Sequence, residues 1–440
     1  MARRRLFGTD GVRGVAGEFL TAELALALAR AATAGAGAQR PRVLVIRDTR
    51  ESGEMLEAAV AAGVAAAGGE ALLGGVLPTP AAPLLMARYG LDLAAVLSAS
   101  HNPFADNGIK FFGGDGFKLS DSQEEEIERA LDRQPSPPLA GPGRIRTLHG
   151  TAEDYVRELQ GRFGGLELAG RRIVLDCANG ATHRVGPDIF RRLGADPLVL
   201  HDRPDGRNIN AGCGSTHVDG LAAAVVEGGH DVGFAFDGDG DRVLAVDRNG
   251  SVVDGDELIA LAALSLRARG RLPGDGVAVT VMTNYGFHTA MREAGIEVAT
   301  TQVGDRYVLE ALRERSWALG GEQSGHVIEM GFVPSGDGIA AALLTLEALD
   351  GGDLADRQAM EKLPQRLVNV RVRERGALDG ADDVHAAARS EGAGLEGRGR
   401  VLVRPSGTEP LVRVMVEAPT AEEADDVCAR LVAVVQRELA

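Results

Sequence analysis

The sequence predicts an α/β protein: three similar α/β domains with mixed, largely parallel sheets, then a smaller C-terminal α+β domain. Two observations predict this class. Short apolar runs alternate with helical stretches three times along residues 1–365, which is the pattern of βαβ units. Residues 366–440 instead follow a β-α-β-β-α order and contain a strand-like alternation at their start.

Each repeated unit holds a first strand, a helix, a second strand and a third strand that ends in polar residues. The expected elements of the first unit are 42–50, 51–67, 71–77 and 93–98; of the second, 172–180, 184–193, 197–202 and 232–238; of the third, 277–284, 286–294, 298–305 and 317–325. The tail adds strands at 366–373, 400–404 and 411–417 and helices at 381–390 and 420–439. A Pro/Gly segment at 134–143 predicts a linker. The expected domains are therefore 1–150, 151–253, 254–365 and 366–440.

The composition excludes several classes of protein. The 440 residues are 45% hydrophobic and 25% charged, as in soluble globular proteins. A net charge of −16 argues against a nucleic-acid binder. Three cysteines cannot form a disulfide framework, and no stretch predicts a signal peptide or a membrane span. We expect a cytoplasmic protein with no nucleic-acid or membrane partner.

A polar loop follows the third strand of each unit: SASHNP (98–103), DGDGDR (237–242) and GEQSGH (321–326). Ligand sites in open α/β sheets gather at the carboxyl ends of the strands. The three loops therefore predict one central cleft that all three units line.

Ser100 has two interpretations. It is either an ordinary loop serine before an Asn-Pro turn or a hydroxyl that carries a phosphoryl group, which needs an activator or a metal nearby. A serine-hydrolase elbow is excluded because no G-x-S-x-G occurs in the chain.

Asp237, Asp239 and Asp241 alternate with glycines, and three such close carboxylates repel one another unless a cation lies between them. Carboxylate oxygens favour Mg²⁺, which often binds a phosphate oxygen as well. Arg242 follows directly and could bind that phosphate. The alternative is a solvated acidic turn.

The other two motifs could hold a ligand. Glu322, Ser324 and His326 alternate after a strand, where they could bind sugar hydroxyls or an amine; the alternative is a polar structural loop. The turn RPSGTEP resembles an anion pocket, or else an ordinary hairpin. Its candidate phosphate ligands are Arg404, Ser406, Gly407 and Thr408, with Arg413 on the next strand.

Only three of the 47 basic residues are lysines: Lys110, Lys118 and Lys362. Codon bias explains most of this, but lysine can give up its proton and arginine cannot. Lys110 lies ten residues after Ser100, so it is the candidate for proton transfer. Nearby arginines and partial burial would lower its pKa, whereas carboxylates and phosphate would raise it, so the sequence leaves the direction of the shift open. We expect Lys118 and Lys362 on the surface.

Together and in this order, FGTDGVRG (7–14), the three loops and RPSGTEP resemble the α-D-phosphohexomutase family, over nearly the whole chain. Three stretches, FGTDGVRG, NINAGCGSTH (208–217) and GEQSGH, are similar to the branch that acts on amino-sugar phosphates rather than to the glucose or mannose mutases. The resemblance implies that Ser100 becomes a phosphoserine and binds one Mg²⁺ together with the three aspartates. It also implies that Arg13, His101 and Lys110 belong to the reacting end, that GEQSGH selects the sugar and that RPSGTEP holds its distal phosphate.

The implied reaction interconverts glucosamine 6-phosphate and 1-phosphate through a 1,6-bisphosphate. A mutase for glucose or mannose phosphates, or a metal-dependent sugar phosphatase, is the alternative. The resemblance implies a homodimer. It leaves open whether an activating kinase, autophosphorylation, or glucosamine or glucose 1,6-bisphosphate first phosphorylates Ser100.

Overall fold

The structure, a computed structural model, describes residues 6–8, 10–133, 141–374, 376–406 and 410–440. The chain forms two compact units. Unit 1 comprises residues 1–281 and 299–357, and unit 2 comprises residues 282–298 and 358–440. None of the helices within the described ranges is both long and apolar enough to cross a bilayer.

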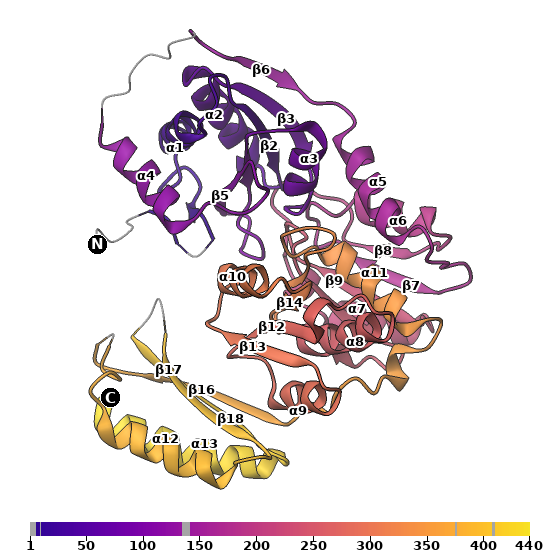
Figure 1. Ribbon diagram of the computed structural model, residues 1–440, viewed down its shortest axis with the longest axis vertical. Helices are drawn as coiled ribbons and strands as arrows, with labels where there is room; N and C mark the ends of the chain where they lie inside the picture. Colours follow the sequence, from indigo (N-terminus) through magenta and orange to yellow (C-terminus); the bar gives the residue numbers. More distant parts are fainter. Residues whose placement is uncertain (1–5, 9, 134–140, 375, 407–409) are drawn as a thin grey trace. The chain divides into compact units, whose positions relative to one another are not determined.

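The first sheet of unit 1 has six strands in the order β1-β5-β4-β2-β3-β6 (Figure 1). Its parallel part is β4-β2-β3-β6, and its antiparallel edge is β1-β5-β4. All five residues of β4 are buried, as expected of a central strand that is covered on both faces. The elements are β1 (Val12–Val15), α1 (Ala22–Gly35), β2 (Arg42–Arg47), α2 (Ser52–Ala66), β3 (Glu70–Val76), α3 (Ala81–Tyr89), β4 (Leu93–Leu97), β5 (Asp106–Gly113), α4 (Asp121–Leu131) and β6 (Arg144–Thr147).

The second sheet repeats this design with five strands in the order β11-β10-β9-β7-β8. Its central strand β9 is again fully buried. The elements are α5 (Thr151–Phe163), β7 (Ile173–Asp176), α6 (Val185–Arg192), β8 (Leu198–Leu200), α7 (Asp219–Glu227), β9 (Val232–Phe236), β10 (Val243–Asp247) and β11 (Val252–Val253).

The third sheet has four strands in the order β13-β12-β14-β15. Helix α8 begins with a capping box in which Asp254 and Glu257 satisfy each other's backbone N–H groups. The elements are α8 (Gly255–Ala268), β12 (Gly276–Thr280), α9 (Tyr285–Glu293), β13 (Glu297–Thr301), α10 (Asp305–Arg315), β14 (Leu319–Gly321), β15 (Val327–Glu329) and α11 (Gly338–Leu349). Helix α9 belongs to unit 2.

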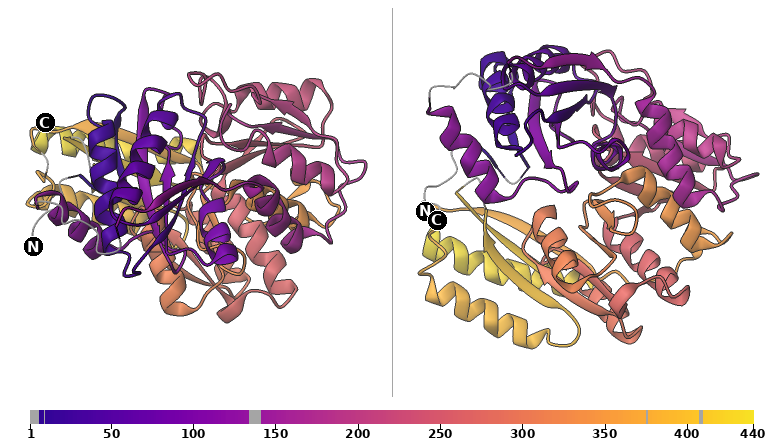
Figure 2. Two further views of the ribbon diagram at one scale, coloured as in Figure 1. Left: turned by 90° about the horizontal axis from the view of Figure 1, so that it is seen from above. Right: turned by 45° about the horizontal axis from the view of Figure 1, so that its top comes forward.

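Unit 2 contains an antiparallel sheet in the order β16-β18-β17. Helices α12 and α13 lie side by side on one face of it (Figures 1 and 2). Along α13 the buried residues Val427, Leu431 and Val435 recur every four positions, which gives the helix one apolar face. The elements are β16 (Gln365–Arg371), α12 (Asp382–Gly394), β17 (Arg400–Pro405), β18 (Leu411–Glu417) and α13 (Ala421–Leu439). The predicted fold class is thereby confirmed.

Candidate active site

Ser100 lies in the loop that follows β4, and it is buried, with only 1% of its surface exposed. Its backbone has a φ of 53°, a left-handed conformation that is unfavourable for a residue other than glycine. The hydroxyl donates to Asp237 Oδ2 over 2.5 Å, and His101 Nδ1 lies 3.3 Å from the same oxygen. The first and second polar loops therefore meet at this hydroxyl.

The side chain of Arg50 fixes the backbone of the loop that carries Ser100. Its guanidinium is fully buried and pairs with Asp48 over 2.9 Å. Nη2 donates to the carbonyls of Ser100 (2.9 Å) and Asn102 (2.8 Å), and Nη1 donates to those of Pro103 and Asp106. Because residues that keep a strained backbone need strong support around them, Arg50 explains how Ser100 keeps its left-handed conformation.

Asn210, which lies between β8 and α7, also binds the backbone of the Ser100 loop. Its side-chain amide donates to the carbonyls of Ser100 (2.9 Å) and Asn102 (3.1 Å). Sequence reasoning missed Arg50, and it included Asn210 only as part of NINAGCGSTH, without a role. Arg50 comes three residues after the end of β2, so the rule that predicted the other loops could have found it.

Asp237, Asp239 and Asp241 lie in the loop between β9 and β10, all of them buried. One oxygen of each lies within 4.8 Å of the others. Oδ1 of Asp239 and Oδ1 of Asp241 are buried and accept no hydrogen bond within the described part of the chain, although buried polar atoms are normally paired. Burial and the charges of Asp241 and Asp239 raise the pKa of Asp237 well above its ordinary value. A cation between the three carboxylates would satisfy the unpaired oxygens and relieve this repulsion.

Lys110, on β5, is enclosed by carboxylates. Its Nζ lies 2.8 Å from Asp239 Oδ2, 3.2 Å from Asp10 Oδ2 and 3.7 Å from Asp241 Oδ2. Burial acts to lower the pKa of Lys110, but the three negative charges outweigh burial and raise it well above its ordinary value. The direction that the sequence left open is therefore upward, and the ammonium is charged in this structure.

The remaining groups predicted for the reacting end lie around Ser100. Arg13, on β1, donates to the carbonyl of Ala99 over 3.3 Å and pairs with Asp10. Arg242 Nη1 lies 3.2 Å from His101 Nδ1. Burial, together with the charges of Arg242 and Arg13, lowers the pKa of His101, so its ring is neutral at neutral pH.

The third loop, between β14 and β15, belongs to the same unit. Glu322 Oε1 accepts the N–H of Gly304 over 3.0 Å, and Ser324 is exposed. His326 is buried: its Nε2 accepts the N–H of Gly336 over 3.1 Å, and its Nδ1 lies 3.7 Å from Asp241 Oδ2. The loop predicted to bind the sugar thus contacts the acidic triad through His326.

The RPSGTEP turn belongs to unit 2. Arg404 on β17 and Arg413 on β18 stand directly opposite each other in the sheet. Burial and the charge of Arg413 lower the pKa of Arg404, and the buried Nε of Arg413 has no hydrogen-bond partner among the residues that the structure describes. Like charges in this position are unfavourable, so the pair would gain from an anion. Ser406 is buried, while Gly407 and Thr408 lie outside the described residues.

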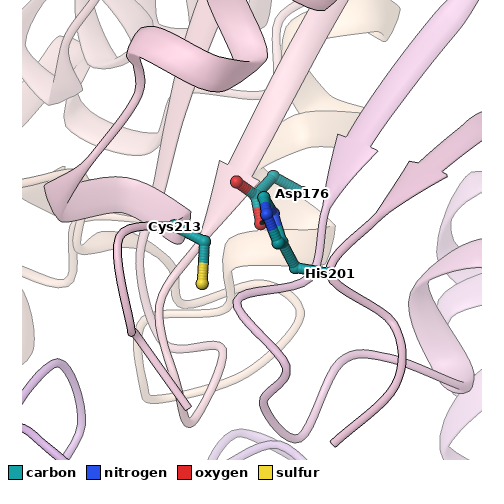
Figure 3. Close-up of side chains that lie close together, drawn as sticks. All are labelled: Asp176, His201 and Cys213. Atoms are coloured by element: carbon teal, nitrogen blue, oxygen red, sulfur yellow. Dashed lines mark ion pairs between the residues drawn. The ribbon is translucent and has the colours of Figure 1, made fainter. Parts of the chain in front are cut away.

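A second cluster of polar side chains lies at the end of the second sheet (Figure 3). Asp176, His201 and Cys213 each place one atom within 4.8 Å of the others. The two Asp176 oxygens accept the N–H groups of Ala178 and Gly214, each over 2.9 Å. Burial raises the pKa of the Cys213 thiol to about 12. The carboxylate is thus used by two backbone N–H groups and by His201, whose Nδ1 lies 3.0 Å from Oδ1, so the cluster ties together the loops that carry it.

The expectation that Lys118 lies on the surface is wrong. Only 10% of its side chain is exposed, because Nζ contacts Asp10 Oδ1 over 2.6 Å and Asp305 Oδ2 over 2.5 Å. Lys362 is exposed as expected. Neither carboxylate partner was singled out from the sequence, although Asp10 belongs to the FGTDGVRG motif that was.

Four family models together match most of the chain between residues 4 and 434. They describe the four domains of phosphoglucomutase/phosphomannomutase: domain I at residues 4–137, domain II at 153–250, domain III at 254–367 and the C-terminal domain at 367–434. A protein named phosphoglucosamine mutase from Moorella thermoacetica is 51% identical, covering 97% of this chain and 98% of its own. One of the same name from Parafrankia is 50% identical and covers 99% of both chains.

Solved structures share the fold. A phosphoglucomutase/phosphomannomutase family protein from Burkholderia thailandensis matches with a TM-score of 0.86 at 26% identity, covering 98% of this chain and 97% of its own. An N-acetylphosphoglucosamine mutase from Aspergillus fumigatus, in complex with GlcNAc-6P and magnesium, has a TM-score of 0.68 at 18% identity, covering 99% of this chain and 96% of its own.

Proposed function

The chain belongs to the phosphoglucomutase/phosphomannomutase family, and from that premise we propose that it interconverts glucosamine 6-phosphate and glucosamine 1-phosphate. Relatives named for this reaction are about half identical over nearly the whole chain. The observation that carries the proposal is the buried Ser100 hydroxyl, hydrogen-bonded to an acidic triad that has unpaired oxygens. This arrangement suits a serine that carries a phosphoryl group.

Asp237, Asp239, Asp241 and the phosphorylated Ser100 would hold one Mg²⁺. The fit rests on the Oδ1 atoms of Asp239 and Asp241, which accept no hydrogen bond from the described residues, and on the preference of Mg²⁺ for carboxylate and phosphate oxygens. When bound, the ion would withdraw negative charge from the phosphoryl group.

The chain's own residues account for the transfer. In the forward step the bond between Ser100 Oγ and phosphorus breaks, and a bond forms between phosphorus and the C1 hydroxyl oxygen of glucosamine 6-phosphate. In the return step Ser100 takes the 6-phosphate from the bisphosphate, which leaves glucosamine 1-phosphate. Such transfers depend mainly on positioning and on stabilising charge, which Arg13, Lys110 and Arg242 supply. Lys110 stays a cation and stabilises the negative charge, because its raised pKa makes proton release unfavourable. The neutral His101 ring, 3.3 Å from Ser100 Oγ, can take the proton that the C1 hydroxyl loses and pass it to Ser100 Oγ.

Glu322, Ser324 and His326 would bind the sugar. Glu322 is the anionic member of the loop and suits the ammonium group of an amino sugar. Arg404, Ser406 and Arg413, with Gly407 and Thr408, would bind the phosphate that does not react. The opposed arginines of β17 and β18 support this role, since an anion would relieve their repulsion.

Steady-state rates on three substrates test the proposal. The protein should turn over glucosamine 6-phosphate with a higher kcat/KM than glucose 6-phosphate or mannose 6-phosphate, in the presence of Mg²⁺ and a hexose 1,6-bisphosphate. A clear preference for a neutral sugar would assign it to the other mutases of the family. Release of inorganic phosphate without a 1-phosphate product would instead indicate a phosphatase.

The variant Glu322→Gln tests whether the charge of Glu322 recognises the amino group of the sugar. The exchange keeps the size and the acceptor oxygen for the Gly304 N–H but removes the charge. The preference for glucosamine 6-phosphate over glucose 6-phosphate should fall, chiefly through KM. An unchanged ratio would place recognition of the amino group elsewhere.

A further inference from the structure

Lys118 joins two segments of unit 1 that are far apart in the sequence. Its Nζ lies 2.6 Å from Oδ1 of Asp10, in the loop before β1, and 2.5 Å from Oδ2 of Asp305, the first residue of α10. All three side chains are largely buried, with 10%, 22% and 13% exposed respectively. Charge-assisted hydrogen bonds in such surroundings are strong and directional.

The Asp10 end of this link reaches the candidate reacting groups. Asp10 uses Oδ1 for Lys118 and Oδ2 for Lys110, at 3.2 Å, and for Arg13. The charges of Lys110, Lys118 and Arg13 outweigh burial and keep the pKa of Asp10 well below its ordinary value. Asp10 is therefore a carboxylate held from both sides, and Lys118 is the one partner of the three that the sequence analysis placed outside the site.

The Asp305 end reaches the candidate sugar loop. Asp305 Oδ2 lies 3.7 Å from His326 Nε2, and the N–H of the neighbouring Gly304 donates to Glu322 Oε1 over 3.0 Å. The start of α10 is thus held by Lys118 on one side and by Glu322 on the other. His326 Nδ1 in turn lies 3.7 Å from Asp241, and Asp241 lies 3.7 Å from Lys110, so the path of contacts closes on itself.

We propose that Lys118 is a positioning residue that sets the spacing between the reacting end and the sugar loop, through Asp10 on one side and Asp305 on the other. The inference rests on the proposed function, since it assumes that these two regions act on one substrate. Lys118 touches none of the reacting atoms. It acts by holding Asp10, and hence Lys110 and Arg13, at a fixed distance from the loop that binds the sugar.

A neighbouring ion pair offers a matched control. Arg306, the next residue after Asp305, pairs with Glu124 on α4 over 3.1 Å and donates to the carbonyl of Leu119. Like the contact between Lys118 and Asp305, this second link joins α10 to the segment that follows β5, but the link itself is made with neither Asp10 nor the sugar loop. Glu124→Gln should therefore weaken the packing of these segments without disturbing the Asp10 carboxylate.

The experiment compares Lys118→Met, Lys118→Arg and Glu124→Gln in the full chain, on whichever hexose phosphate the wild type turns over best. The unfolding temperature shows whether each variant is folded, and its rise on addition of Mn²⁺ shows whether the acidic triad is intact. The constants kcat and KM are measured separately. Because displacements of about 1 Å can cost about a hundredfold in rate, we expect Lys118→Met to lower kcat by roughly ten- to a hundredfold while keeping its Mn²⁺ response. Glu124→Gln should lower the unfolding temperature and keep kcat.

Lys118→Arg should recover most of the lost rate. A guanidinium can donate to both carboxylates, and a cavity of about 80 Å³ beside Lys118, lined by Arg306 and Leu309, gives it room. A Lys118→Met protein with wild-type kcat and only a lower unfolding temperature would overturn the proposal. Should Lys118→Met not fold, Asp305→Asn weakens the same link more mildly; wild-type kcat there would overturn it equally. A wild type that makes no 1-phosphate refutes the proposed function instead.

Discussion

The guanidinium of Arg50 donates to the carbonyl oxygen of Ser100 over 2.9 Å, and it is fully buried while doing so. The phosphoserine candidate therefore does not depend on a surface loop for its position. The loop wraps around a charged side chain that is itself anchored to Asp48, at the end of a core strand. A substitution at Arg50 can therefore change the position of the Ser100 hydroxyl without an equal change in the stability of the protein.

Arg50→Lys should lose much more activity than stability. Lysine keeps a positive charge beside Asp48, so the buried carboxylate is not left alone, which would cost about 3–5 kcal/mol. It cannot, however, serve four loop carbonyls at once, because its donors lie on a single nitrogen. We expect a severalfold to hundredfold loss of kcat, and urea unfolding of the same variant should show a much smaller loss of stability. Wild-type kcat in Arg50→Lys would show that the loop needs only the charge.

Ser100→Ala should abolish turnover and leave the fold intact. The hydroxyl is the group proposed to carry phosphate, and its removal leaves Asp237 with one acceptor oxygen unused. Intact-mass measurement after incubation with glucose 1,6-bisphosphate should show one added phosphate on the wild type and on Ser122→Ala, an exposed control on α4, but none on Ser100→Ala. Phosphate found on Ser100→Ala would move the acceptor elsewhere.

Local pattern predicted the repeated parallel strands, the tail and the polar loops, because these depend on neighbours in the sequence. It missed the antiparallel strands β1, β5 and β10 and several helices, among them α1, α8 and α11. The strand at 93–97 is a continuous apolar run, and the polar loops after β4, β9 and β14 follow from the ends of such runs. Lys118 was misplaced because its partners are 108 and 187 residues away. The upward pKa shift of Lys110 likewise needs carboxylates from two separate loops, Asp10 and Asp239, and only the folded chain brings these together.

Metal binding should depend on the acidic triad and not on the cluster around Cys213. A ligand that binds the native state alone stabilises it by about 2.7 kcal/mol at a hundred times its Kd. Mg²⁺ or Mn²⁺ should therefore raise the unfolding temperature, and a chelator should reverse this and stop turnover. Asp239→Asn should abolish the rise, whereas Cys213→Ser should keep it. A rise that survives in Asp239→Asn and vanishes in Cys213→Ser would reverse the assignment.

Arg404→Met should remove the response of unit 2 to anions. Arg404 and Arg413 face each other across the sheet, a like-charge pair whose relief is worth up to about 1 kcal/mol. Without anion the variant should be as stable as the wild type or slightly more so. Inorganic phosphate should raise the unfolding temperature of the wild type and of Arg371→Met, an exposed control on β16, but not that of Arg404→Met. An equal rise in all three would locate the anion elsewhere.

Asp337 should make the protein less stable as the pH rises from about 4 to about 6. Burial raises its pKa to about 6 from an ordinary value of 3.8, against hydrogen bonds from Ala340 and Tyr155 that lower it. The folded state therefore holds a proton over this range that the unfolded state has lost, and stability falls as the proton leaves. At 1.36 kcal/mol per pKa unit, the loss is at most about 3 kcal/mol. Asp337→Asn keeps an acceptor for the N-cap bond to Ala340 and cannot ionise.

Urea unfolding of both proteins at several pH values should show the wild type losing stability relative to the variant between pH 4 and 6. A constant difference would mean that Asp337 titrates normally in the folded protein.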